Sequence, residues 1–220
     1  MFAPSFPISE NLLNVFKGTV NLIKNPSQTD SVYDIEDGLQ NSSIMKISLN
    51  YIKRHPENVE IIAERYIAPS PDLNQLLTYP KNSLGYQYAF HLKQAGFDPN
   101  FYRPIAITNE ASYVLFRFRQ THDIWHLVTG FDTNVIGELG LKAFEIAQTR
   151  RPLAFVLLVG GLFKGLIHFP RSLNLLLQQI IRGYRLGNHC QPFLAQKWEE
   201  NWKKPLTEWQ EKLRVTSFQE

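Results

Sequence analysis

The sequence predicts an all-α protein with a single multi-helix domain across residues 1–220, and three observations lead to this fold class. Apolar residues recur at steps of three and four along most of the chain, which is the spacing of one helix face. No run of alternating polar and apolar residues lies between hairpin turn signals. The 220 residues, 44% hydrophobic and 20% charged, suffice for one buried core, and no internal repeat or glycine-serine linker divides them.

The first half of the chain is expected to form helices separated by proline-containing breaks. The first helix has apolar residues at steps of one, three, four and three from Leu12 to Ile23, and Asn25-Pro26-Ser27 ends it. Proline suits the first position of a helix, so His55-Pro56 is expected to open another. The expected ranges are about 12–23, 38–53, the helix opened by His55-Pro56, 72–78, and 83–95, which Gly96 ends.

The second half begins with an irregular segment at 97–109, which carries Pro99 and Pro104. Further on, Gly130-Phe131-Asp132-Thr133 is expected to break the chain, with Asp132 or Thr133 as the N-cap of the next helix. Ser172 is suited to cap a later helix. The expected helices cover about 111–125, 134–148, a segment from Leu153 onward, 173–184, and a tail helix that packs Trp198, Trp202, Leu206, Trp209 and Leu213 onto the body.

Charge and cysteine content exclude several classes of protein. With 23 basic and 20 acidic residues the net charge is +3, too small to indicate nucleic-acid binding but suited to weak attraction to an anionic membrane. The single cysteine, Cys190, rules out an internal disulfide, fits a reducing compartment and is expected to be buried packing. The start of the chain lacks the pattern of a signal or transit peptide. We therefore expect a cytoplasmic protein, peripheral on the inner membrane surface.

The most apolar stretch, from Leu153 to Phe163, is stopped by Lys164 and has about half the roughly 20 residues of a membrane-spanning helix. It is expected to be a buried core helix or one that dips into the membrane interface. Gly160, Gly161 and Gly165 remove side chains from this helix, which would open a groove for an isoprenoid tail or simply allow close helix packing. Arg150-Arg151 and Arg171 flank the stretch and suit either a lipid head-group layer or solvated helix ends.

The residues that carry chemistry lie in His122-Asp123-Ile124-Trp125-His126, followed after eleven residues by Glu138. On a helix, His122 and His126 point in nearly the same direction with Asp123 between them in angle. Glu138 would lie about 24 Å away along a continuous helix. The break at Gly130-Phe131-Asp132-Thr133 allows the chain to turn back, so all four residues are expected to bind one divalent metal ion.

Two imidazoles and two carboxylates suit zinc, iron or manganese, and the oxygen-rich set also admits magnesium. Ligands from only two helices leave coordination positions open, as in catalytic sites. The pattern is not that of a zincin, which needs glutamate directly after the first histidine. Two alternatives stay open: histidines that merely hydrogen-bond at a helix interface, and the phosphohydrolases named for a His-Asp doublet. The latter would need an upstream histidine, for which His91 is the nearby candidate, and a late aspartate that the sequence lacks.

Two cations lie near the motif. Arg119 is four residues before Asp123, and Lys142 is four residues after Glu138, so each is expected to form an (i, i+4) pair with that carboxylate. Either could instead meet an anionic head group. The candidate substrate-binding residues are therefore Arg119, Lys142, Gly160, Gly161 and Phe163.

Around the metal motif the sequence resembles the Coq-four family of ubiquinone (coenzyme Q) biosynthesis proteins. The family's spacing of His-Asp-x-x-His, eleven residues and Glu is met without departure. The first thirty residues resemble the family least, and the residues before Leu84 differ from its pattern. The resemblance is carried by Arg117-Phe118-Arg119-Gln120, His122-Asp123-x-x-His126, Gly137-Glu138, Lys142, Phe144-Glu145, Pro80 with Ser83-Leu84-Gly85, Trp198-Glu199, Pro205-Leu206 and Leu213.

The resemblance implies a helical, membrane-peripheral, dimeric protein that binds a polyprenyl lipid and a divalent metal and works with other quinone biosynthesis proteins. It also implies oxidative decarboxylation, in which hydroxyl replaces the ring carboxyl of a prenylated 4-hydroxybenzoate, with Glu138 and Asp123 as the candidate catalytic residues. The alternative is a non-catalytic lipid-binding scaffold or carrier for the other enzymes. A ligand set without cysteine favours catalysis, whereas the absence of a flavin or nicotinamide motif leaves the scaffold open.

Overall fold

A computed structural model of the protein describes residues 29–168 and 170–218, so the helix expected at 12–23 lies outside the described residues. The described residues are helical, without a β-strand, which confirms the all-α prediction. The α-helices are α2 (Thr29–Leu39), α3 (Ser43–Ile52), α4 (Pro56–Glu64), α5 (Leu73–Leu76), α6 (Leu84–Ala95), α7 (Glu110–Thr129), α8 (Val135–Thr149), α9 (Pro152–His168), α10 (Leu173–His189) and α11 (Leu206–Lys212). Two 3-10 turns, η1 (Pro170–Ser172) and η2 (Trp198–Asn201), complete the list.

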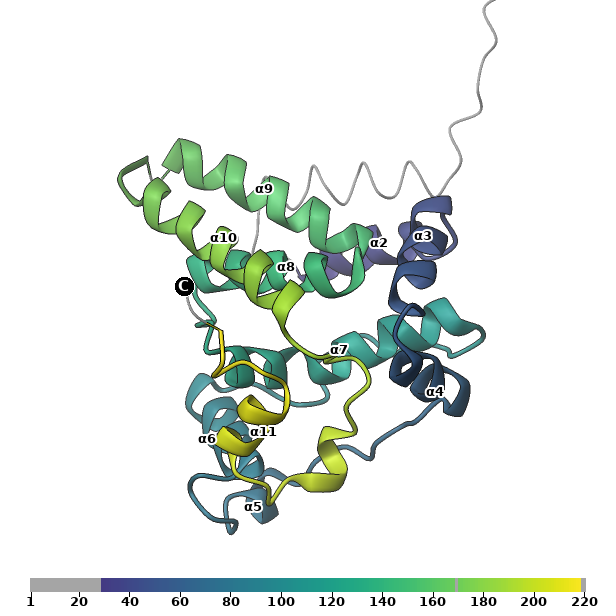
Figure 1. Ribbon diagram of the computed structural model, residues 1–220, viewed down its shortest axis with the longest axis vertical. Coiled ribbons are helices and arrows are strands. Elements are labelled where there is room, and N and C mark those ends of the chain that lie inside the picture. The colour runs from purple at the N-terminus through teal and green to yellow at the C-terminus, as the bar shows by residue number, and fades with distance from the viewer. Residues whose placement is uncertain (1–28, 169, 219–220) are drawn as a thin grey trace, which may run out of the picture.

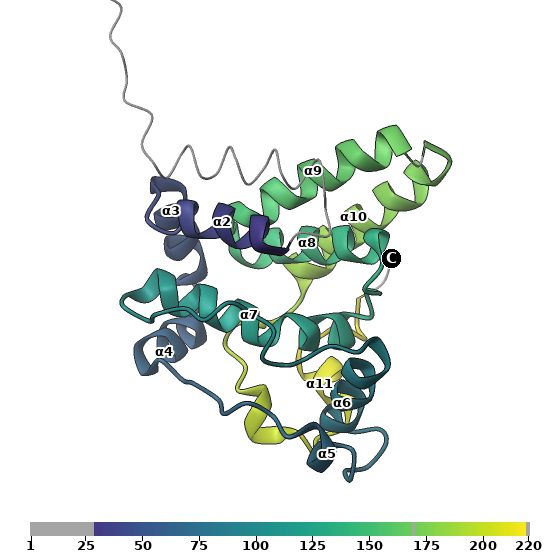
Figure 2. The ribbon, with the colours of Figure 1, turned by 180° about the vertical axis from the view of Figure 1, so that it is seen from behind.

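The helices form two layers with α7 between them (Figures 1 and 2). Helices α8, α9 and α10 lie together at one end, with α2 beside them, while α5, α6 and α11 lie at the other end. Helix α7 runs across the middle and carries the two histidines of the motif. Because α8 follows α7 after a short turn, the motif lies where the two layers meet.

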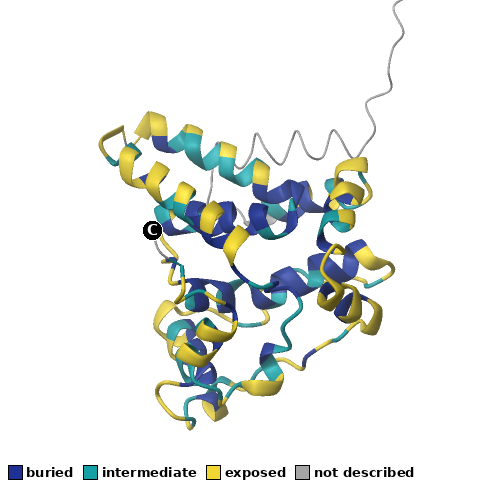
Figure 3. Ribbon diagram, viewed as in Figure 1, coloured by how far each residue is buried: buried dark blue, intermediate teal, exposed yellow. Residues whose placement is uncertain are grey.

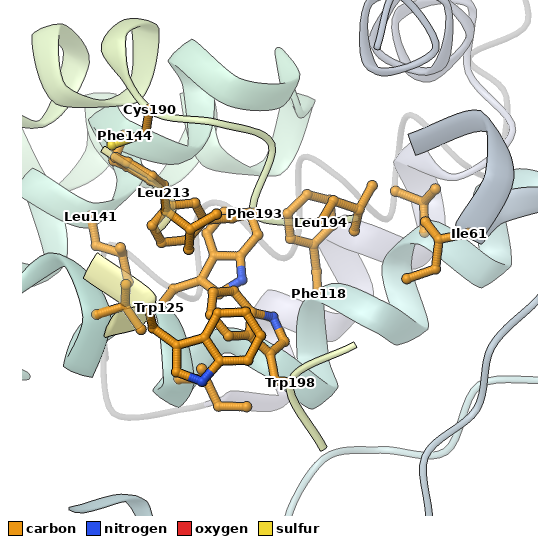
Figure 4. Packing of buried hydrophobic residues seen from close by; sticks show 14 of the residues in the cluster. Ile61, Phe118, Trp125, Leu141, Phe144, Cys190, Phe193, Leu194, Trp198 and Leu213 are labelled. Carbon is orange, nitrogen blue, oxygen red and sulfur yellow. The ribbon is translucent and has the colours of Figure 1, made fainter. Parts of the chain in front are cut away.

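Buried aromatic rings join α7 to α8 and to the C-terminal segment (Figure 4). The ring centroids of Trp125 and Phe144 are 5.8 Å apart, and Phe193 lies 5.5 Å from Trp125 and 4.8 Å from Phe144. These edge-on contacts extend to Trp198, which is fully buried. Such pairs contribute beyond their area burial, so the motif helix is anchored through Trp125 to α8 and to the C-terminal segment.

Helix α8 packs most extensively against α10, and glycine makes the contact possible. A Cβ atom on Gly183 would lie 2.0 Å from the carbonyl oxygen of Gly140, and one on Gly187 would lie 2.6 Å from that of Phe144. The two backbones therefore approach more closely than any side chain would allow. Cys190 follows α10 and is buried, as expected.

The outer sides of α9 and α10 carry exposed apolar side chains (Figure 3). Among the described residues, no helix alone has both the length and the hydropathy to cross a membrane. The bent pair Pro152–His168 and Pro170–His189, which turns by 118°, meets that test when its two helices are taken together. The exposed residues are Phe155, Val159, Phe163, Leu166, Ile167, Leu175, Leu177, Ile181 and Tyr184.

Several expected elements were wrong in their limits, among them the helix expected at 173–184, which continues to His189. The expected helix at 38–53 is two helices, because Ser42 caps a new helix by accepting a hydrogen bond from the Met45 N–H at 3.1 Å. The expected tail helix is divided into η2 and α11, because Pro205 has no N–H to continue a helix. The motif helix α7 begins at Glu110 and continues to Thr129, four residues beyond its expected end. Ser172 precedes α10 as expected, but its side chain makes no capping hydrogen bond.

Candidate metal centre

The turn between α7 and α8 brings the two halves of the motif together. Helix α7 ends at Gly130, whose φ of +72° is the left-handed conformation that glycine favours. Asn134, rather than the expected Asp132 or Thr133, caps α8 by accepting a hydrogen bond from the Gly137 N–H at 2.9 Å. A Cβ atom on Gly137 would lie 2.1 Å from the Asp132 carbonyl oxygen, so only glycine allows this tight return. Glu138 consequently faces back toward α7.

Three donor atoms converge at this turn. Glu138 Oε1 lies 3.0 Å from His126 Nε2 and 3.7 Å from His122 Nε2, and the two histidine nitrogens are 3.3 Å apart. Neighbouring ligands of a tetrahedral ion bound at 2.0–2.1 Å lie about 3.3 Å from one another. Within the described residues, His122, His126 and Glu138 form the group of histidine and acidic side chains close enough together to bind a metal.

His126 is held in the tautomer that a metal ligand needs. Its Nδ1 lies 2.9 Å from the Phe131 carbonyl oxygen, so Nδ1–H donates to that oxygen and Nε2 keeps its lone pair. The side chain is only 3% exposed, and the carbonyl partner fixes the ring plane. Since Nε2 of His126 faces both His122 and Glu138, the unprotonated nitrogen points at the centre of the group. The residues therefore fit a divalent ion.

The electrostatics of the group favour a neutral histidine beside an ionised carboxylate. Burial works to raise the pKa of Glu138, but the adjacent His122 and His126 and the positive charge of Lys142 outweigh it and hold that pKa far below its usual range. Burial lowers the pKa of His122, and the positive charge of Lys142 lowers it further. Both shifts put the ligands in the protonation states that bind a cation.

Asp123, the fourth expected ligand, is not a member of this group. It is partly buried and lines the same cavity as His122 and Glu138. The pKa of the Tyr102 phenol is raised well above 10.0, first by burial and then by the negative charge of Asp123. His91, on α6, is not in the group either, so the arrangement lacks the extra histidine of the His-Asp phosphohydrolases.

A cavity of about 590 Å³ adjoins the candidate metal centre. One part of its wall is charged, with His122, Asp123 and Glu138 at the motif. Another part is aromatic and apolar, and comes from the segment before α7, from α7 itself and from the start of α9. Such a mixed wall suits a ligand with a polar head and an apolar body. The apolar and aromatic residues include Phe97, Phe101, Tyr102, Phe118, Trp125, Leu153 and Leu157.

The expected local pairs of Arg119 and Lys142 were wrong, although both residues line the cavity. Arg119 donates from Nε to Glu36 Oε2 at 2.7 Å, and Glu36 lies on α2 rather than one turn away. Lys142 Nζ lies 3.2 Å from Glu145 Oε2, so it pairs forward along α8 and not back to Glu138. Burial explains both differences, because these cations need carboxylates that are equally shielded from water.

The cavity does not include Gly160, Gly161 or Phe163, the other expected substrate residues. Gly160 faces open space, whereas a Cβ atom on Gly161 would lie 2.4 Å from Leu139, so Gly161 serves close packing. Phe163 is 55% exposed on the outer side of α9. Sequence reasoning missed Glu36, Tyr102 and Glu145, and took Arg151 only for a flanking cation. Of these, Phe144-Glu145 stood within the family motif but without a role.

Comparison with known proteins identifies the family. The sequence profile of the family described as coenzyme Q (ubiquinone) biosynthesis protein Coq4 matches residues 3–219. The rat and human proteins named ubiquinone biosynthesis protein COQ4 homolog, mitochondrial, are 28% and 29% identical to this chain. Each alignment covers 97% of this chain, with 80% of the rat protein and 81% of the human one.

A solved structure has the same fold. This is the crystal structure of a Nostoc punctiforme PCC 73102 protein whose name proposes a role in ubiquinone biosynthesis. It superposes with a TM-score of 0.84 at 34% identity, over 92% of this chain and 97% of that one. The family match covers nearly the whole chain, and with it the motif that forms the candidate metal centre. The chain therefore belongs to the Coq4 family of coenzyme Q (ubiquinone) biosynthesis proteins.

Proposed function

We propose that this protein binds one divalent metal ion through His122, His126 and Glu138, with Asp123 as a further ligand or catalytic carboxylate. We also propose that it acts on the ring carboxyl of a prenylated 4-hydroxybenzoate. The observation that carries the proposal is the convergence of three donor atoms within 4.8 Å. Hydrogen bonding alone explains this poorly, because His126 already uses its Nδ1–H on Phe131 and its Nε2 lone pair faces the other two groups.

The proposed reaction breaks the bond between the ring and the carboxyl carbon, releases carbon dioxide and forms a ring carbon–oxygen bond to hydroxyl. Dioxygen supplies that oxygen atom, and its second atom leaves as water with two electrons and two protons from a reductant. A third proton, from solvent, converts the ring oxygen of the product to hydroxyl. When bound, the metal would supply Lewis-acid stabilisation of negative charge on the ring oxygens, and a redox metal such as iron would also supply electrons to dioxygen. Zinc or magnesium would supply the first of these alone.

The chain's own residues would bind and orient the ring. Phe118, Trp125 and Leu157 line the cavity and would exclude water from the aromatic ring. Glu138 is ionised, while the raised pKa of Tyr102 keeps its phenol protonated as a hydrogen-bond donor near Asp123. The anionic Glu138 and the neutral Tyr102 phenol would interact with different substituents of the ring, which would give the ring a single orientation in the cavity.

Aerobic incubation of purified protein with a prenylated 4-hydroxybenzoate and a two-electron reductant tests the enzyme. We expect carbon dioxide and the hydroxylated ring in equal amounts, and loss of both in Glu138→Ala. The matched control is Glu60→Gln, an exposed carboxylate on α4. Binding that depends on tail length, without turnover under any metal supplied, would contradict the enzyme and favour the carrier.

The carrier remains the second candidate because of the exposed apolar side chains on α9 and α10. Residues such as Phe155, Val159 and Phe163 are 43%, 65% and 55% exposed, which is costly unless a lipid, a membrane or a second copy covers them. In this proposal the protein is peripheral on a membrane, dimeric and presents a polyprenyl lipid to other quinone biosynthesis proteins. Sedimentation with lipid vesicles, compared between the wild type and Val159→Lys, tests it. Unchanged sedimentation would contradict membrane contact through this face.

A further inference from the structure

Arg151 lies in the short connection between α8 and α9, at the wall of the cavity. Its neighbour Arg150 has a φ of +56° and extends to Tyr184, whereas Arg151 is 6% exposed. The sequence suggested either a lipid head-group layer or a solvated helix end for both arginines. A buried guanidinium beside a cavity is different, because its charge must be compensated by groups inside the protein.

The groups around Arg151 fix the position of its guanidinium but do not fill all of its hydrogen-bonding capacity. Arg151 Nε is 2.7 Å from Glu145 Oε1, and Nη1 is 3.7 Å from Glu36 Oε1. Yet Arg151 Nε, Glu145 Oε1 and Glu36 Oε1 are all buried and make no hydrogen bond of good geometry. The guanidinium carbon lies 4.5 Å from the centre of the Phe118 ring, which covers one face. Hence a fork of five N–H donors is fixed in place with unfilled hydrogen-bonding capacity.

The neighbouring Arg119 is better satisfied than Arg151. Arg119 donates to Glu36 Oε2 from Nε and Nη2, and donates from Nη1 to the Arg103 carbonyl at 2.7 Å. Lys142 donates to Glu145 Oε2. Burial works to raise the pKa of Glu145, but Arg151 and Lys142 hold it below 4.5, so Glu145 is an anion shared by two cations. Arg151 and Lys142 therefore have one carboxylate between them, whereas Arg119 has Glu36.

The buried charges that line the cavity also leave one positive charge uncompensated. Its buried cations are Arg119, Lys142 and Arg151, and its buried carboxylates are Glu36 and Glu145, so one positive charge is in excess. Asp123 and Glu138 balance the divalent ion of the proposed function, on which this part of the inference rests. A single buried excess charge is costly, and one anionic substituent of a ligand would remove the cost.

We propose that Arg151 is a specificity-determining residue that binds the carboxylate of an aromatic acid in the cavity, with Glu145 and Phe118 fixing its guanidinium. The planar fork of arginine matches a carboxylate through two parallel hydrogen bonds. A phosphate monoester offers similar oxygens but carries close to two negative charges at neutral pH, one more than the wall lacks. The site therefore selects a monoanionic acid over its amide and over a phosphate.

Calorimetric titration of 3-geranyl-4-hydroxybenzoate, its carboxamide and geranyl monophosphate into the protein tests the inference. Charged hydrogen bonds of this kind predict that the wild type binds the acid roughly 10- to 100-fold more tightly than the amide. In Arg151→Met this ratio should fall to near one, while Arg151→Lys should keep part of it. The adjacent variant Arg150→Met is the matched control and should keep the wild-type ratio.

Arg151→Met leaves Glu145 unpaired and is at risk of misfolding, so the double variant Glu145→Gln/Arg151→Met, in which neither charge remains, provides a second route. An unchanged ratio in either folded variant, equal binding of acid and amide by the wild type, or Arg151-dependent preference for the phosphate would overturn the assignment. The titrations are repeated in Glu138→Ala without metal. An Arg151-dependent ratio there supports the carboxylate subsite even if the proposed metal function fails.

Discussion

The two sides of helix α8 are built on different principles. One side carries Glu138, Lys142 and Glu145 at steps of four and three, and these charged residues line the cavity. The other side meets α10, where the backbone of Gly140 lies directly against Gly183. The charged side is held by His122 and His126 of α7 and by Arg151 in the connection after α8. The glycine side is held by close backbone packing and by Gln148, which donates to the Gly187 carbonyl oxygen at 2.6 Å.

The two sides of α8 are therefore expected to respond differently to substitution and to ligand binding. Buried charges are stabilised only while each has its partner, so the cavity wall tolerates a new ligand that supplies charge but not the loss of one member. The glycine contact leaves no space for even one methyl group, so it fixes the angle of α10 against α8. We infer that the close contact with α10 holds α8 in place, so that its charged side can bind a ligand without moving the helix.

The largest expected effect comes from breaking the buried ion pair between Arg119 of α7 and Glu36 in the charged wall of the cavity. Arg119→Met would leave Glu36 buried without its main partner, and we expect a loss of about 3–5 kcal/mol in the free energy of unfolding, measured by urea denaturation. The control is Lys53→Met, which breaks the exposed pair with Glu110 and should cost below about 1 kcal/mol. Equal small losses in both variants would contradict the distinction between buried and exposed pairs.

A somewhat smaller effect is expected on the glycine side. Gly183→Ala would place Cβ 2.0 Å from the Gly140 carbonyl oxygen, which is backbone and has no room to rotate away. We expect a loss of about 3 kcal/mol, the upper part of the usual range for overpacking. Thermal unfolding followed by circular dichroism measures it. A variant as stable as the wild type would show that the two helices can separate without cost.

The same comparison explains how much could be predicted from sequence. The long helices followed from apolar spacing, and the metal motif followed from helical geometry and one break. The partner of Arg119 could not be found in this way, because Glu36 is 83 residues distant and its own helix was missed. Helix α2 has the sequence TDSVYDIEDGL, in which few residues favour helix, and it is held by tertiary contacts such as those of Tyr33 and Ile35.

The roles of the glycines in α9 could not be predicted from sequence for a related reason. A glycine in an apolar helix has the same sequence signature whether it faces open space, as Gly160 does, or packs against a neighbour, as Gly161 does. The two glycines differ only in whether a residue of α8, here Leu139, lies against them. The buried state of Arg151 was equally hidden, because Arg150 beside it has the same side chain and points toward Tyr184.

Acid should weaken the charged side before the glycine side. The pKa of Glu145 in the folded protein lies below 4.5, so its contribution to stability is present above pH 4.5 and is lost as the pH falls through the lower, folded value. In Glu145→Gln, we expect the stability difference from the wild type to shrink as the pH falls below 4.5. Urea midpoints at several pH values measure this. A difference that does not vary with pH would contradict it.

The smallest expected effect is a gain. Gly160→Ala adds a methyl group where the structure has open space, and alanine is the better helix former by about 0.5–1 kcal/mol. Thermal unfolding should therefore show a slightly more stable protein, in contrast to the loss at Gly183. Destabilisation by this change would mean that a partner covers Gly160 in solution.

The central claim is that the charged side of α8 completes a metal centre, and elemental mass spectrometry tests it most directly. Wild type, His126→Ala and Glu138→Ala are purified without added metal or affinity-tag histidines, and their helical content is checked by circular dichroism. We predict about one equivalent of a divalent metal in the wild type and its loss in both variants, with the helical signal retained. A wild type without metal, even after zinc, iron, manganese and magnesium are supplied, would contradict the account.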